Sequence, residues 1–260
     1  MPSFLEGFSI IQIGMMASIA AGLATGVGGI PILFTTKVSE RTRDILLGFA
    51  AGVMLAATSF SLIIPAIEYG GGGVSGVAVV VVGMLVGAIF LDVIDKLSPH
   101  QHFIKGPEGA HNPRLAAIWL FIIAITIHNF PEGLAVGVGF GGGDVGNGIA
   151  LAIGIGLQNI PEGLAVALAL VGEKYSRGTA FLAALLTGLV EPLGGFLGLY
   201  LVQLMQGILP YGLAFAAGAM LFVISDEIIP ETHRTGFERA ATYAVVIGFL
   251  VMMLLDSTLG

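Results

Sequence analysis

Long apolar runs that are nearly free of charge constrain this sequence more than any other feature. The hydrocarbon core of a bilayer is about 30 Å thick, and an α-helix needs about 20 apolar residues to cross it. In lipid, a segment outside a closed β-barrel satisfies its backbone hydrogen bonds only as an α-helix. Each apolar run therefore predicts one transmembrane helix. The predicted spans are Ile10–Phe34, Ile45–Ile67, Val74–Leu91, Leu115–Phe140, Ile149–Val171, Thr179–Leu204, Tyr211–Ile229 and Ala240–Leu255. The predicted fold class is an all-α integral membrane protein with eight transmembrane helices.

The composition agrees with a chain whose main partner is the lipid bilayer. Charged residues make up 10 % of the chain and hydrophobic residues 56 %, with a mean hydropathy of +0.97. A soluble domain carries about 25 % charged residues. The N-terminal stretch Met1–Glu6 has no basic residue, unlike a cleaved signal peptide, so the first run is taken as a retained span. We expect no nucleic-acid partner, and the net charge of −7 is not the ground for this, because several of the acids fall inside apolar segments and do not form a solvated surface.

The positive charges test the number of spans. All ten lysines and arginines fall in alternate connections between the predicted spans. They are Lys37, Arg41 and Arg43; Lys96, Lys105 and Arg114; Lys174 and Arg177; and Arg234 and Arg239. Cytoplasmic loops carry the excess of Lys and Arg, which predicts that these four connections are cytoplasmic and that both termini lie outside. We therefore expect one transmembrane domain over residues 1–260, with a cytoplasmic loop at 96–114.

Two segments resemble each other at a distance and predict an inverted repeat. The sequence Phe-Ala-Ala-Gly-Val-Met-Leu at 49–55 returns as Phe-Ala-Ala-Gly-Ala-Met-Leu at 215–221. The predicted topology runs these two spans in opposite directions, so spans 1–3 and 6–8 would be related around spans 4–5, as in many secondary transporters. The alternative is convergence of small-residue membrane sequence.

A second repeat is sharper and carries polar residues into the membrane. Residues 128–136 read His-Asn-Phe-Pro-Glu-Gly-Leu-Ala-Val, and residues 158–166 read Gln-Asn-Ile-Pro-Glu-Gly-Leu-Ala-Val. Each copy falls near the middle of its span. A third acid, Glu191, lies in span 6 within Val-Glu-Pro-Leu-Gly.

The buried acids Glu132, Glu162 and Glu191 need an explanation, because an ionised carboxylate at mid-membrane costs several kcal/mol. No lysine or arginine lies at that depth, so these groups must be protonated, hydrated or held by a bound cation. His128 and Glu132 are four residues apart and project from one helical face, about 6 Å apart along the axis.

Imidazole and carboxylate ligands suit Zn²⁺, Fe²⁺ and Mn²⁺, and the absence of cysteine argues against a dedicated Cu⁺ site. The sequence therefore predicts a divalent metal site. The structural alternatives for single members are a buried neutral histidine at position 128 and a protonated structural carboxyl at position 191.

The doubled motif is similar to that of the ZIP (Zrt/Irt-like) transporters, in the bacterial branch that has Gln at the first position of the second block. This resemblance covers nearly the whole chain. It implies a two-metal centre, with Glu132 and Glu162 bridging. One site would use His128, Glu132, Gln158 and Glu162, and the other Asn129, Glu132, Asn159, Glu162 and Glu191.

Further polar residues lie toward the predicted cytoplasmic ends of spans 3 and 7. They are Asp92, Asp95, His100 and His102, and Asp226, Glu227, Glu231 and His233. They form either an exit path for the ion or ordinary charged helix ends at the interface.

The function predicted is uptake of divalent transition-metal ions, with Zn²⁺ first and Fe²⁺, Mn²⁺ or Cd²⁺ as further cargo, across a bacterial inner membrane. The metal is cargo, and no prosthetic cofactor is expected. The rival classes are a membrane-embedded metal-dependent hydrolase and a scaffold with structural metal. The spacings Gly48/Gly52 and Gly83/Gly87 pack helices either within one chain or in a homodimer.

Overall fold

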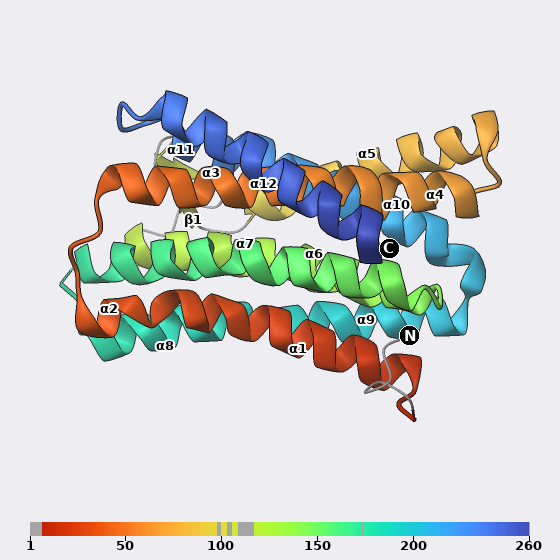
Figure 1. Ribbon diagram of the computed structural model, residues 1–260, viewed down its shortest axis with the longest axis horizontal. Helices are drawn as coiled ribbons and strands as arrows, with labels where there is room; N and C mark the ends of the chain where they lie inside the picture. Colours follow the sequence, from red (N-terminus) through yellow and green to blue (C-terminus); the bar gives the residue numbers. More distant parts are fainter. Residues whose placement is uncertain (1–6, 98–99, 103–105, 109–116, 173, 260) are drawn as a thin grey trace.

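The computed structural model describes residues 7–97, 100–102, 106–108, 117–172 and 174–259 as a bundle of long helices that run side by side (Figure 1). The α-helices are α1 (Ile10–Gly29), α2 (Pro31–Phe34), α3 (Glu40–Ala56), α4 (Ile64–Tyr69), α5 (Gly73–Leu97), α6 (Ala117–Gly141), α7 (Val145–Gly172), α8 (Arg177–Gly188), α9 (Glu191–Leu204), α10 (Leu209–Val223), α11 (Ile229–Thr232) and α12 (Glu238–Leu259). Two π-helical segments, η2 (Ala57–Ile63) and η4 (Ile224–Ile228), and one 3₁₀ turn, η3 (Gln206–Ile208), complete the helical part. Strands β1 (His100–His102) and β2 (Gly106–Glu108) form a short antiparallel pair within the predicted 96–114 loop.

The membrane-spanning prediction is confirmed. Among the described residues, seven helical segments are long and apolar enough to cross a bilayer, and α6, at 25 residues, is an eighth helix of spanning length. The observed segments extend past several predicted ends, as in Glu40–Tyr69 for the second span. The reason is that charged residues such as Arg43 continue the helix beyond its apolar part.

Four spans are not single α-helices, which the sequence reading did not anticipate. Span 1 is divided at Ile30, before Pro31, and span 6 at Leu189 and Val190, before Pro192. Spans 2 and 7 pass through π-helical turns just before Pro65 and Pro230. A proline ring clashes with the carbonyl four residues earlier, and a wider π turn relieves that clash.

The pairing of helices supports the predicted inverted repeat. The α7 helix packs closely on α1, and α6 packs in the same way on α9; likewise α3 packs on α12, and α10 on α5. The repeat relates span 1 to span 6, span 2 to 7, span 3 to 8 and span 4 to 5. Under this exchange the α1–α7 interface corresponds to the α9–α6 interface, and the α3–α12 interface corresponds to the α10–α5 interface. The two halves therefore use equivalent helix interfaces.

Glycine contacts show the same symmetry at residue level. A Cβ added at Gly28 would lie 2.0 Å from the carbonyl oxygen of Ile160, and one at Gly194 would lie 2.3 Å from the carbonyl oxygen of Phe130. A shift of 166 residues relates the two glycines, and a shift of 30 relates their partners. Both contacts require glycine, because any side chain would strike a neighbouring backbone.

The glycine pairs noted in the sequence pack helices within one chain. Gly48 and Gly52 lie against the backbone of α12, and Gly83 and Gly87 lie against α10. These spacings therefore have an intrachain role and give no support to a homodimer.

Both described chain ends lie toward the same end of the bundle, at the right in Figure 1. The connections α4–α5, α6–α7 and α9–α10 lie at that end. The connections that follow α2, α7 and α11, together with β1, lie at the other. The described parts of the four connections that hold the lysines and arginines therefore share one end of the molecule.

Candidate metal centre

The doubled motif places its polar side chains in the interior of the bundle. His128, Asn129 and Glu132 come from α6, Gln158, Asn159 and Glu162 from α7, and Glu191 from α9. Their exposed fractions range from 0 to 6 %. The structure thus buries all seven residues that the sequence predicted for the site.

The glycine that follows each motif glutamate sets how closely the helices approach. A Cβ at Gly133 would lie 2.0 Å from the main-chain oxygen of Glu191, and one at Gly163 would lie 1.8 Å from that of Thr25. The Pro-Glu-Gly triplets therefore bring α6 onto α9 and α7 onto α1 at the depth of the carboxylates.

The break in span 6 places Glu191 at the first residue of α9. The free N–H groups and the dipole at a helix N-terminus favour a negative charge there. The hydroxyl of Ser18 on α1 donates to the Glu191 carbonyl at 3.1 Å, which ties the break to the facing helix. The break thus supplies partial positive charge at a depth that has no lysine or arginine.

Two amide side chains bridge the helices that carry the acids. The Gln158 amide donates from Nε2 to Oε1 of Glu132 at 2.5 Å, which joins α7 to α6. The Asn159 amide donates from Nδ2 to Oε1 of Glu191 at 2.7 Å and to the Ala21 carbonyl at 2.9 Å, which joins α7 to α9 and α1.

The same cluster leaves several buried polar atoms without a hydrogen-bond partner among the described residues. Glu132 lies within electrostatic range of Glu162 and Glu191, so three carboxyl groups share one interior region. The atoms without a partner are Oε2 of Glu132, Oε1 of Gln158, Oε1 of Glu162, Oε2 of Glu191 and both amide atoms of Asn129. Buried oxygens without donors are costly, and a cation satisfies them directly.

Within the part of the chain that the structure describes, no three His, Asp or Glu side chains already stand in coordinating positions. Ion binding therefore requires the carboxylates and amides to rotate. Gln158, for example, presents its amide nitrogen to Glu132, while its oxygen is the unpartnered atom.

Glu227, predicted for the exit path, reaches the centre itself. Its Oε2 lies 2.8 Å from Nδ1 of His128, and it is also within electrostatic range of Glu162. Glu227 stands in the π-helical segment η4. The residue before it, Asp226, lines a groove between α5 and α10 together with Met84 and Phe222. Glu227 therefore connects the buried cluster to span 7.

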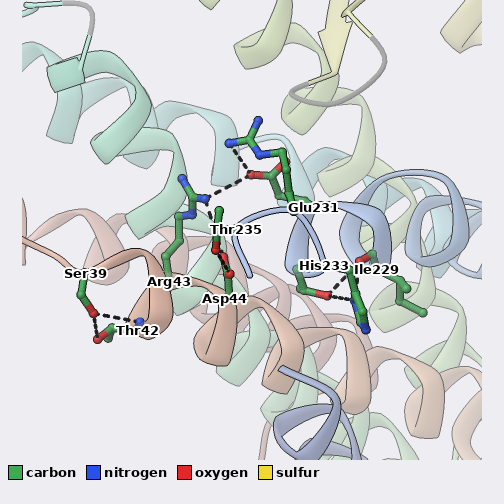
Figure 2. Close-up of polar contacts among 10 residues, drawn as sticks. Ser39, Thr42, Arg43, Asp44, Ile229, Glu231, His233 and Thr235 are labelled. Carbon is green, nitrogen blue, oxygen red and sulfur yellow. Dashed lines mark hydrogen bonds and ion pairs between the residues drawn. The ribbon is translucent and has the colours of Figure 1, made fainter. Parts of the chain in front are cut away.

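Glu231 and His233 make contacts that hold helix ends together, as the helix-end alternative predicts (Figure 2). Oε1 of Glu231 lies 3.6 Å from Arg43 and 3.3 Å from Arg234, within an ion-pair cluster that includes the fully buried Asp44. Asp44 also accepts a hydrogen bond from the Thr235 hydroxyl. This cluster ties the start of α3 to the end of α11.

The ring of His233 is held on both sides. Its Nδ1 lies 2.8 Å from the Thr232 hydroxyl and 3.0 Å from the Ile229 carbonyl, and its Nε2 lies 3.3 Å from the Thr242 hydroxyl. These contacts close the end of α11 and link it to α12, which favours the helix-end alternative for His233.

The remaining exit-path candidates lie at the end of α5 and beyond. Asp92 is partly exposed and pairs with Lys96 at 2.7 Å, one turn further along the same helix. The side chains of Asp95, His100 and His102 lie outside the described residues. No metal contact is assigned to them.

The sequence reading missed the contribution of span 1. Thr25 is fully buried, and its hydroxyl lies beside the carboxyl group of Glu191. Extending the repeat comparison would have found it, because the shift of 166 residues that relates Phe49 to Phe215 also relates Thr25 to Glu191.

A membrane-spanning inverted repeat with buried carboxylates between its halves is typical of proteins that transport ions across membranes. Comparison with known proteins identifies the family. The family model described as ZIP Zinc transporter matches residues 106–256. Zinc transporter GufA of Myxococcus xanthus is 47 % identical over 251 residues, which is 95 % of this chain and 99 % of the relative.

Other relatives extend across bacteria and animals. Zinc transporter ZIPB of Bordetella bronchiseptica is 42 % identical over 98 % of this chain and 85 % of the relative. Zinc transporter ZIP11 of Homo sapiens is 36 % identical over 98 % of this chain and the full relative. The chain belongs to the ZIP zinc transporter family, and it is a multi-pass membrane protein. This is a family of transporters, and the comparisons give the hydrolase alternative no support.

Proposed function

We propose that this protein takes up Zn²⁺ through the buried cluster on α6, α7 and α9. Its relatives are zinc transporters by name. The observation that carries the assignment is the set of buried carboxyl and amide oxygens without partners, contributed by Glu132, Gln158, Glu162 and Glu191. Several oxygen ligands and the imidazole of His128 suit Zn²⁺, with Fe²⁺, Mn²⁺ and Cd²⁺ as further cargo.

The donor set supports a binuclear arrangement. Glu132 and Glu162 stand at equivalent places in the two motif copies, and each has one oxygen without a hydrogen bond among the described residues. In the proposed centre these two carboxylates bridge two ions. His128 and Gln158 complete one site, and Asn129, Asn159 and Glu191 complete the other.

The proposed exit runs from His128 to Glu227 and then toward the end of the bundle that holds the basic connections. The 2.8 Å contact between His128 and Glu227 supports this direction. Asp226 follows as the next oxygen donor in η4. Glu231 and His233 stabilise the helix ends around this route rather than bind the ion.

The proposed location is the inner membrane of a bacterium, with both termini on the extracytoplasmic side and the 96–114 loop in the cytoplasm. The clustering of basic connections at one end of the bundle supports this orientation. Because the chain has no cysteine, single cysteines report sidedness cleanly. A membrane-impermeant thiol reagent should label Ser75→Cys in intact cells and leave Thr36→Cys unlabelled, and the reverse pattern would invert the topology.

The transport function is tested with purified protein in liposomes that hold a trapped zinc-sensitive dye. The proposal predicts saturable Zn²⁺ influx above that of empty liposomes. Hydrolysis of generic ester and peptide substrates is measured in the same preparation. Turnover without flux would replace the transporter with the hydrolase, and stoichiometric binding without either would indicate a metal-containing scaffold.

A further inference from the structure

The inverted repeat gives Glu191 a counterpart in the first half of the chain. A shift of 166 residues relates Thr25 to Glu191, as it relates Gly28 to Gly194. The packing agrees, because Gly163 of the second motif lies on the Thr25 backbone as Gly133 of the first lies on the Glu191 backbone. Thr25 therefore stands in span 1 where the carboxylate of the centre stands in span 6.

The hydroxyls of two buried threonines, Thr25 and Thr58, make no hydrogen bond to their own helix, unlike those of Thr126 and Thr187. A buried threonine in a helix usually hydrogen-bonds to a carbonyl in its own preceding turn. Thr126 does so with Ile122 at 2.7 Å, and Thr187 does so with Ala184 at 2.9 Å. Of the two, Thr25 is fully buried and lies beside the carboxyl group of Glu191.

The surroundings hold this hydroxyl at the centre. A Cβ added at Gly188, the residue that ends α8, would lie 2.2 Å from the Gly22 carbonyl oxygen and 2.6 Å from the Thr25 hydroxyl oxygen, so the glycine leaves room for the Thr25 side chain. The same hydroxyl lies beside the carboxyl group of Glu191, whose Oε1 accepts from Asn159. A hydroxyl from span 1 and a carboxyl group from span 6 thus stand next to each other.

The two halves differ in how their asparagines are used. Asn159 donates to Glu191, whereas its repeat partner Asn129 has both amide atoms buried without a partner among the described residues. The repeat relates the pair Asn159 and Glu191 to the pair Asn129 and Thr25. One pair therefore offers only neutral oxygens, from Asn129 and Thr25, whereas the other pair includes the charged oxygens of Glu191.

We propose that Thr25 is a selectivity-determining residue whose hydroxyl oxygen binds the ion held by Glu191. This inference rests on the proposed function, since it assigns a ligand to the same centre. A hydroxyl adds a hard oxygen donor without adding charge, so the centre keeps three carboxylates instead of four. Hard donors favour Mn²⁺ relative to softer ions, so Thr25 broadens the set of ions that the centre accepts.

The test replaces this hydroxyl with a thiol in a chain that has no other cysteine. Thr25→Cys puts a soft ligand at the centre, and Thr187→Cys is the matched control, because Thr187 is equally buried but bonded within its own helix. Purified proteins are titrated with Cd²⁺ and with Zn²⁺ in detergent. The expected result for Thr25→Cys is an ultraviolet cadmium–thiolate absorption band and an affinity ratio of Cd²⁺ to Zn²⁺ raised at least about tenfold.

Two further variants, Thr25→Val and Thr25→Ser, test the same hydroxyl if the thiol of Thr25→Cys disturbs folding. Thr25→Val removes the hydroxyl at constant shape and should weaken Zn²⁺ binding about tenfold, with a larger loss for Mn²⁺, while Thr25→Ser retains wild-type values. An unchanged affinity ratio in Thr25→Cys and Thr25→Val, or an equal cadmium band in Thr187→Cys, would overturn the assignment. Failure of the wild-type protein to move Zn²⁺ in liposomes would instead overturn the proposed function, so the two failures are distinguishable.

Discussion

Replacing Gly163 with alanine should separate α7 from α1 and dismantle the centre between them. The new Cβ would lie 1.8 Å from the Thr25 carbonyl oxygen, whereas ordinary contact begins near 3.4 Å, so the helices must move apart by about 1.6 Å. Overpacking of this kind costs about 3 kcal/mol at the upper end of the usual range. The same movement stretches the 2.9 Å hydrogen bond from Asn159 to the Ala21 carbonyl, and losing this one bond costs about a further 1 kcal/mol.

The assay is denaturant unfolding of purified protein in mixed micelles, together with Zn²⁺ flux in liposomes. Gly156→Ala is the matched control on the same helix, because its new Cβ would meet nothing closer than 3.8 Å. The control should change the unfolding free energy by less than about 1 kcal/mol and retain flux. If Gly163→Ala is as stable and as active as Gly156→Ala, the close approach of α7 to α1 is wrong.

The remaining predictions concern three charged contacts, two near the end of span 7 and an exposed one at the end of α5. His128→Ala and Glu227→Gln should each reduce Zn²⁺ flux. The double variant should lose no more flux than the poorer single variant, because both changes remove the same 2.8 Å contact. Additive losses in this double-mutant cycle would contradict the prediction. Arg43→Gln should lower the unfolding free energy by about 3 kcal/mol, because it leaves Asp44 fully buried without its cation. Lys96→Gln, which breaks an exposed pair, should cost less than about 1 kcal/mol, and equal losses in these two variants would refute the buried cluster.

Hydropathy and charge alone predicted most of the fold. Eight apolar runs and the alternation of basic connections gave the spans and the shared end of the two termini, because lipid allows few other solutions. The helix breaks were not predicted, since an apolar run reads the same whether its helix is continuous or interrupted. Pro31 and Pro192 were the available signals, as were Pro65 and Pro230 for the π-helical turns.

The candidate centre was predictable where the motif repeats and not where single residues contribute from other spans. The spacing of His128 and Glu132 places both on one face of a helix whatever surrounds it. The position of Glu227 depends on how span 7 packs, so the sequence assigned it to the exit path alone. Thr25 carries no charge, so it can be recognised as a candidate only when the inverted repeat is extended into span 1, where it corresponds to Glu191.

The two alternatives that the sequence left open for His233 show a further limit of sequence patterns. Histidine and acids near a helix end suggest metal ligands, but the same residues close helix ends equally well. In the structure both ring nitrogens of His233 contact polar groups, those of Thr232, Ile229 and Thr242. These contacts depend on how α11 packs against α12, which the sequence does not reveal.

The central claim is that Zn²⁺ crosses through the carboxylates between α6 and α7, and one paired flux measurement tests it most directly. Wild-type protein and Glu162→Gln are reconstituted at equal density, with Glu68→Gln at the end of α4 as the control for loss of one acid outside the centre. The account predicts saturable Zn²⁺ influx for the wild type and the control, and none above empty liposomes for Glu162→Gln. Wild-type influx in Glu162→Gln would place the path of the ion elsewhere.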